Sequence, residues 1–158
     1  MPTMAHGDRL LWVAFLAGCV TLALVGCSTI SGAKQSCESN FGVLDAKEVL
    51  CSGSVEAMSG SPSLDIIDIG GQLDGAFLLE ATMQVEQGTA RAYVTDIDDN
   101  KVGGELSPDA PLRIRATVYP EESEEADDDN EVVELQLEIP EEKEVNNLRY
   151  EATLVQKD

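Results

Sequence analysis

Residues 76–85 read Ala-Phe-Leu-Leu-Glu-Ala-Thr-Met-Gln-Val, and this stretch decides the fold class. Apolar side chains stand at every second position, and polar ones fall between them. The apolar set is Phe77, Leu79, Ala81, Met83 and Val85, and the polar set is Glu80, Thr82 and Gln84. Successive side chains of a β-strand point to opposite faces, so the pattern predicts a strand with one buried face and one exposed face.

The same alternation recurs along the chain. It is clear in residues 112–119, 133–139 and 148–154, and the first two of these runs stop at Pro120 and Pro140. It is weaker in residues 48–57, 64–69, 89–97 and 101–106. Beyond the first thirty residues, no segment shows a convincing helical period. The sequence therefore predicts an all-β domain of seven or eight strands, after an N-terminal signal helix.

Strands with one apolar face each cannot bury that face in a single flat sheet. Two antiparallel sheets packed face to face solve the problem, so we expect a β-sandwich, either immunoglobulin-like or jelly-roll-like. On its outer surface we expect Arg113 and Arg115 to lie opposite Glu134 and Glu138. The run from Val85 to Asn100 loosely resembles hairpins of β-sandwich modules in exported bacterial lipoproteins, a resemblance that carries no function with it.

The first residues have a different character. Residues 10–25 (LLWVAFLAGCVTLALV) contain no charge and follow Arg9. Sixteen residues are few for a membrane span, which needs roughly 17 to 25, but they suit the hydrophobic region of a signal peptide. The run ends in Leu24-Val25-Gly26-Cys27.

This tetrapeptide resembles the lipobox of bacterial lipoproteins. The resemblance implies that Cys27 receives a diacylglyceryl group, that the chain is cut just before it, and that the new amino terminus is acylated. It further implies an extracytoplasmic protein, bound through acylated Cys27 to the lipid bilayer of a bacterial cell envelope. The alternative is an uncleaved N-terminal helix, and both readings place the domain outside the cell membrane.

The resulting domain plan has three parts. Residues 1–26 form the signal peptide, and residues 27–36 form the lipidated Cys with a flexible tether of small polar residues. Residues 37–158 form a single β-sandwich domain that contains an acidic loop at 121–131. Cys37 and Cys51 are the only cysteines of that domain. An oxidising compartment favours a disulfide between them, and two buried thiols are the alternative.

Charge excludes one class of partner. Thirty acidic and ten basic residues give a net charge of −20, which leaves no basic footprint for nucleic acid. Residues 121–131 hold eight carboxylates in eleven residues, which predicts a solvated loop; the alternative is Ca²⁺ bound through Asp127, Asp128 and Asp129. Residues 96–100 place oxygen ligands at calcium-loop spacing, but Lys101 stands where Gly should be, so we expect a β-turn there.

The sequence contains few of the side-chain types that commonly act in catalysis. The single His, His6, lies in the signal, so the exported domain has no imidazole base or imidazole metal ligand. We expect a non-catalytic binding or structural module without a cofactor, and an envelope protein is a further candidate partner. One alternative is a calcium-responsive adhesion or binding module. A third is an enzyme that uses carboxylates or a Ser-Lys pair.

Overall fold

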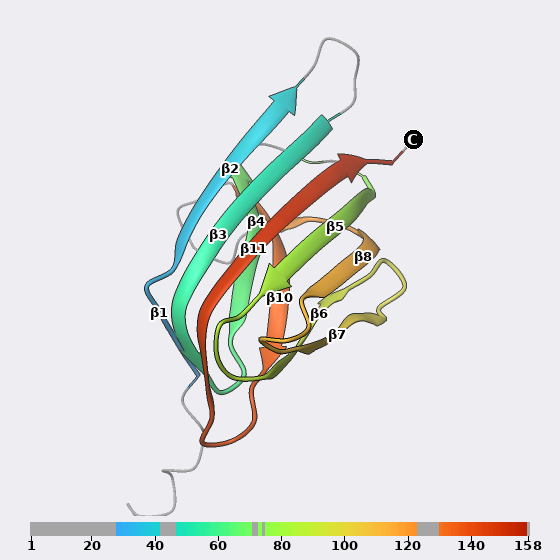
Figure 1. Ribbon diagram of the computed structural model, residues 1–158. Coiled ribbons are helices and arrows are strands. Elements are labelled where there is room, and N and C mark those ends of the chain that lie inside the picture. Colours follow the sequence, from blue (N-terminus) through green and yellow to red (C-terminus); the bar gives the residue numbers. More distant parts are fainter. Residues whose placement is uncertain (1–27, 42–46, 71–72, 74, 123–129, 158) are drawn as a thin grey trace, which may run out of the picture.

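The computed structural model describes residues 28–41, 47–70, 73, 75–122 and 130–157, and these residues form two antiparallel β-sheets (Figure 1). The six-stranded sheet contains β1 (Thr29–Ser31), β2 (Lys34–Phe41), β3 (Lys47–Ser59), β5 (Phe77–Gln84), β8 (Leu112–Val118) and β11 (Glu144–Gln156). The five-stranded sheet contains β4 (Ser63–Gly70), β6 (Ala90–Thr95), β7 (Lys101–Leu106), β9 (Glu121–Glu122) and β10 (Asn130–Glu138). Within these residues no helix is long and apolar enough to cross a membrane.

Strand order identifies the sandwich as a jelly roll. The order is β3-β11-β5-β8 in one sheet and β4-β10-β6-β7 in the other. Among these eight strands only β6 and β7 are neighbours both in the chain and in a sheet, and each other connection crosses from one sheet to the other. Two four-stranded sheets joined in this way are the jelly-roll arrangement. The two-sheet all-β expectation is confirmed, and its jelly-roll alternative is the one that the structure adopts.

The apolar faces of the two sheets meet in one core. The apolar set of residues 76–85 is buried; Phe77, Leu79, Ala81, Met83 and Val85 are each at most 3% exposed. In β4 the consecutive residues Ile66 and Ile67 are both fully buried. Strict alternation would expose one of them, but the pairing with β10 shifts register between Val133 and Glu134. A bulge of this kind turns an additional side chain inward.

Each of the eight strands expected from alternation is present, and three short or edge strands are added to them. β9 pairs with the start of β10, and β1 and β2 both pair with β3. β3 is thirteen residues long, and pairing along its outer edge satisfies backbone groups that would otherwise be left open.

β1 and β2 correct the expectation of a flexible tether at residues 27–36. Residues 29–31 and 34–36 lie in these strands, Thr29 bonds to Ser59 at the end of β3, and Ser28 bonds to Ser61 in the turn that follows. Small polar residues carry no apolar alternation, but their backbone groups pair with a strand edge as well as those of any other residue. The predicted signal helix at residues 1–26 lies outside the described residues.

Cys37 and Cys51 form a disulfide, as the sequence predicts. They are direct partners in the β2–β3 register, and their Cα atoms are 4.1 Å apart. Cys51 is completely buried, and Cys37 packs against the core. The bond therefore fastens the edge strand β2 to the sandwich at a buried position.

Candidate functional site

A hollow lies on the outer face of the six-stranded sheet, the face turned away from the core. We call it the sheet groove; its volume is about 800 Å³. β2, β3, β11, β5 and β8 contribute its lining, together with Pro111 just before β8. The lining residues are Lys34, Gln35, Ser36, Ser52, Gly53, Ser54, Thr82, Met83, Gln84, Pro111, Arg113, Arg149, Tyr150 and Glu151.

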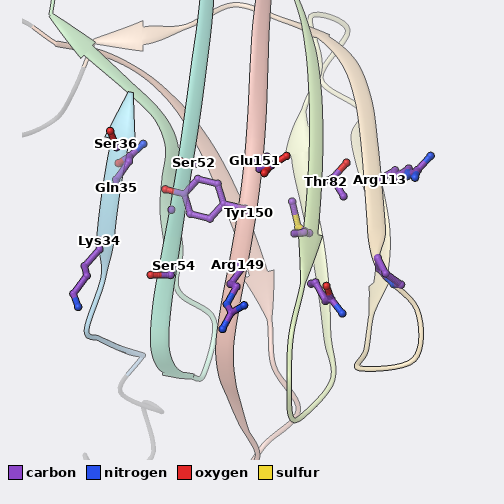
Figure 2. Close-up of a pocket in the computed structure, with 14 residues that line it drawn as sticks. Lys34, Gln35, Ser36, Ser52, Ser54, Thr82, Arg113, Arg149, Tyr150 and Glu151 are labelled. Atoms are coloured by element: carbon purple, nitrogen blue, oxygen red, sulfur yellow. The ribbon is translucent and has the colours of Figure 1, made fainter. Parts of the chain in front are cut away.

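Strand register arranges the outward side chains of the groove in two rows (Figure 2). The Arg149 row runs from Lys34 through Ser54 and Arg149 to Gln84. The Glu151 row runs from Ser36 through Ser52, Glu151 and Thr82 to Arg113. Each row crosses the strands, because direct partners in neighbouring strands point to the same face.

Small hydroxyl side chains explain why the face is hollow at this point. β3 contributes Ser52 and Ser54, β2 contributes Ser36, and β5 contributes Thr82. The next row along the strands has Leu50 on β3, which is 49% exposed, with Glu38 and Thr153 as its partners. Two longer side chains, Leu50 and Glu38, therefore border the floor of short ones on this side. Every residue type on this floor can donate or accept hydrogen bonds.

The groove is locally positive in a strongly negative protein. Its lining contains three cationic side chains and one carboxylate, so Lys34, Arg113 and Arg149 against Glu151 give 3 − 1 = +2. The whole chain contains ten Lys and Arg residues and has a net charge of −20. Three of ten basic residues thus gather in a single hollow.

Arg149 forms an ion pair with Glu86. Its Nη2 lies 3.3 Å from Oε1 of Glu86, and the two side chains are 74% and 54% exposed. Asn147, whose φ is 54°, donates from Nδ2 to the other oxygen of Glu86 at 2.9 Å. An ion pair this exposed contributes little free energy, so a ligand carboxylate can replace Glu86 at small cost.

Tyr150 supports the floor from the inner side. Its side chain is 4% exposed and lies against Gly53 of β3, where a Cβ would be 2.6 Å from ring atom Cε1 and closer still to Cζ and the hydroxyl oxygen. Burial, helped by the negative charges of Asp65 and Asp68, raises the pKa of Tyr150 to about 12. The phenol is therefore neutral at physiological pH and acts in packing.

Two functional predictions from the sequence fall on other segments of the chain. Cys27, the expected lipidation site, and Asp127, Asp128 and Asp129, the calcium alternative, all lie outside the described residues. Within the described residues no group of three or more His, Cys, Asp or Glu side chains is placed to hold a metal ion.

The turn predicted at residues 96–100 is confirmed. Oδ1 of Asp96 accepts hydrogen bonds from the backbone N–H groups of Asp98 at 2.9 Å and Asn100 at 2.8 Å. The hydrogen bonds donated by Asn100 and Asp98 hold the pKa of Asp96 below its usual value. Asp99 takes the left-handed backbone conformation, with φ at 61°. The oxygen that a calcium ion would need is thus engaged within the turn.

The expected pairing of Arg113 and Arg115 with Glu134 and Glu138 is wrong. β8 pairs with β5 and lies in the other sheet from β10, so Arg115 meets Glu80 at 3.0 Å and Arg113 stands opposite Thr82. Alternation places each of these residues on an outer face, but it does not say which strands are neighbours.

Glu138 has partners within its own sheet. It accepts a hydrogen bond from Tyr93 at 3.0 Å and forms an ion pair with Lys101 at 3.4 Å. These two contacts hold the pKa of Glu138 below its usual value.

Sequence reasoning missed the sheet groove altogether. Its residues come from five strands between Lys34 and Glu151, and none belongs to a recognisable motif. The one local signal is the row of hydroxyl residues in a strand otherwise bordered by large or charged side chains, Ser52 and Ser54 after Leu50.

Comparison with known proteins identifies no family. No family model and no curated protein matches the sequence. Among solved structures, procruciferin, an 11S globulin of Brassica napus, is 12% identical with a TM-score of 0.32, over 69% of this chain and 21% of that one. The CBM22-1–GH10 modules of Clostridium thermocellum endo-1,4-β-D-xylanase 10B, complexed with xylohexaose, are 9% identical with a TM-score of 0.31, over 83% and 26%.

A third solved structure is similar over most of its length. The family 11 carbohydrate-binding module of the cellulosomal cellulase Lic26A-Cel5E of Clostridium thermocellum is 13% identical with a TM-score of 0.30, over 83% of this chain and 87% of that one. This chain spans about a fifth of the procruciferin chain and a quarter of the xylanase chain. Likenesses this distant identify neither a family nor a ligand for the chain.

Proposed function

We propose that this chain is an exported, lipid-anchored module of the bacterial cell envelope that binds a ligand, without catalysis, in the sheet groove. The observation that carries the proposal is the groove itself. It is a hollow of about 800 Å³ in which five strands present hydroxyl, amide and charged side chains on an otherwise regular sheet face. Strands hold these side chains at fixed spacings, which favours recognition of a ligand with a repeating structure.

The composition of the groove supports binding rather than hydrolysis. Glycoside hydrolysis and related acid–base chemistry use two carboxylates with separated roles. Glu151 is the only carboxylate among the described residues that line the groove. Its neighbours in the row are Ser52 and Thr82, which hydrogen-bond but do not act as a base near neutral pH.

The position of the amino-terminal residues supports the lipid anchor. Ser28, the residue after Cys27, accepts a hydrogen bond from the backbone N–H of Ser61 at 3.0 Å, and the Thr29 hydroxyl bonds that of Ser59 at 2.8 Å. The start of β1 lies at the lower end of the sandwich in Figure 1, beside the turns after β3 and β10. An acyl group on Cys27 would therefore hold this end close to the bilayer.

Anchoring at that end leaves the groove accessible. The strands run from the anchored end to the opposite end, and the groove lies on the side of the sandwich, across those strands. A ligand parallel to the membrane surface would reach the groove without passing beneath the domain. Two or three acyl chains would give the stable attachment that one chain does not.

Metabolic labelling with a fatty-acid precursor tests the anchor. We expect the full-length chain to be labelled and processed in a bacterial host, and Cys27→Ala to abolish both labelling and cleavage. Cys19→Ala, which removes a cysteine from within the hydrophobic run, is the matched control and should leave both unchanged. Normal labelling and processing of the Cys27→Ala chain would overturn the anchor.

A further inference from the structure

The cations of the sheet groove are regularly spaced across the strands. Lys34 lies on β2, Arg149 on β11 and Arg113 on β8. One strand separates each from the next, β3 in the first gap and β5 in the second. Because neighbouring strands lie about 4.8 Å apart, successive cations are about 10 Å apart across the sheet, and Arg113 is also displaced along its strand by two residues, roughly 7 Å, from the row of Lys34 and Arg149.

Hydrogen-bonding side chains occupy the strands between these cations. Ser54 stands between Lys34 and Arg149 in the Arg149 row. Thr82 stands between Arg113 and Glu151 in the other row, and Gln84 lies beside Arg149. Counted over both rows of the groove, cations therefore stand on β2, β11 and β8, neutral side chains stand on β3 and β5 between them, and Glu151 adds one carboxylate on β11.

Given the proposed binding function, on which this step rests, we propose that the ligand is an extended acidic polysaccharide. Its chain runs across the strands, its carboxylates meet Lys34, Arg149 and Arg113, and its hydroxyls meet Ser52, Ser54, Thr82 and Glu151. One small anion cannot span cations about 10 Å apart, so the ligand carries acidic groups at intervals along an extended chain.

The absence of exposed rings in the groove favours charge over stacking. Tyr150 is the one aromatic residue among the described residues that line it, and it is 4% exposed. A neutral sugar would hydrogen-bond to these side chains but would form no ion pair with Lys34, Arg113 or Arg149. Charge-assisted hydrogen bonds are roughly twice as strong as neutral ones, and an Arg guanidinium donates two parallel hydrogen bonds to one carboxylate.

An acidic peptide fits this face less well. Side chains on one face of an extended peptide repeat about every 7 Å, which does not match a spacing of about 10 Å. A peptide strand also needs partners for its backbone N–H and C=O groups, and it finds them at sheet edges. On the face of the sheet those groups are already paired in the ladders of β3, β5 and β11.

The affinity of the full-length chain for four polymers tests this inference. The chain is purified in mild detergent and titrated with hyaluronate, polygalacturonate, dextran and poly-L-glutamate in 150 mM KCl, where the Debye length of about 8 Å limits repulsion by distant carboxylates. We expect at least one of the two uronate-containing polysaccharides, hyaluronate and polygalacturonate (below, the polyuronates), to bind. We expect dextran not to bind. Binding of dextran, or tighter binding of poly-L-glutamate than of both polyuronates, would overturn the inference.

Three variants test whether the polymer binds in the groove and whether the groove recognises its negative charge. Arg113→Gln combined with Arg149→Gln should weaken polyuronate binding at least tenfold. Arg91→Gln combined with Lys143→Gln makes the same charge change outside the groove and should have less than a twofold effect. Glu151→Gln removes the one carboxylate of the lining and should strengthen polyuronate binding about two- to fivefold, whereas it would weaken binding of a neutral sugar.

The outcomes separate the ligand from the function. Equal effects of the two double variants would place the polyanion outside the groove and overturn the inference. Binding of dextran that is lost in a groove variant would reject the acidic ligand and keep the groove as a binding site. Failure of all four polymers to bind would overturn the acidic-polysaccharide inference, while the lipid anchor is judged separately by labelling at Cys27.

Discussion

Gly53 and Tyr150 provide the sharpest test of how the six-stranded sheet is packed. They are direct partners in the β3–β11 register, and the Tyr150 ring covers the place where a side chain of residue 53 would point. A Cβ there would lie 2.6 Å from Cε1 of the ring and closer still to Cζ and the hydroxyl oxygen. Substitution by Ala must therefore displace a buried ring.

We expect Gly53→Ala to destabilise the protein. Overpacking of a core typically costs about 1 to 3 kcal/mol. Removal of a Gly from a strand interior returns roughly 0.5 to 1 kcal/mol. The midpoints of these two ranges leave a net loss of about 1 kcal/mol, which for a domain of this size lowers the Tm by roughly 3 to 5 °C.

A double-mutant cycle assigns that loss to the ring. In a Tyr150→Leu background the same Gly53→Ala change should cost nothing or stabilise slightly, because the atoms it meets are gone. Gly70→Ala is the control, since the nearest atom to a Cβ there, Oδ1 of Asn130, lies at an ordinary 3.4 Å. Denaturant unfolding followed by circular dichroism gives all four free energies. A Gly53→Ala cost that is equal in both backgrounds would refute the packing argument.

Three further predictions concern the disulfide, the buried phenol and the surface charge. Reduction of the Cys37–Cys51 bond should lower the free energy of unfolding by about 3 kcal/mol, the chain-entropy value for a loop of about 15 residues. Alkylation of both thiols without reductant would contradict the bond. The Tyr150 phenol should ionise with a midpoint of about 12 when absorbance at alkaline pH is followed, and Tyr150→Phe should remove that step. Burial raises the pKa of the folded state above the unfolded value of about 10. The contribution of Tyr150 to the free energy of unfolding is therefore complete below pH 10 and is lost as the pH rises through 12. Stability should rise with KCl between about 0.01 and 1 M, because salt screens the self-repulsion of a chain with net charge −20, and a Tm that stays constant over that range would count against it.

The local sequence pattern was sufficient to predict the eight jelly-roll strands. Alternation marks each of the eight jelly-roll strands, because a strand with one buried face must repeat apolar residues with period two. It missed β1, β2 and β9, whose residues show no such period. β1 and β2 form because the long strand β3 offers an unpaired edge, and that edge exists only in the assembled sheet.

The sequence by itself determined the fold class, the inward faces of the strands and the Cys37–Cys51 disulfide. Alternation and cysteine number are local or countable properties, so they are readable without knowing which strands are neighbours. The tertiary structure alone decided the strand order, the Arg115–Glu80 ion pair and the sheet groove. Backbone ladders form between any two strands, so local sequence does not specify which strands pair. Only the β3-β11-β5-β8 order, with β2 at its edge, brings Lys34, Arg113 and Arg149 onto one face.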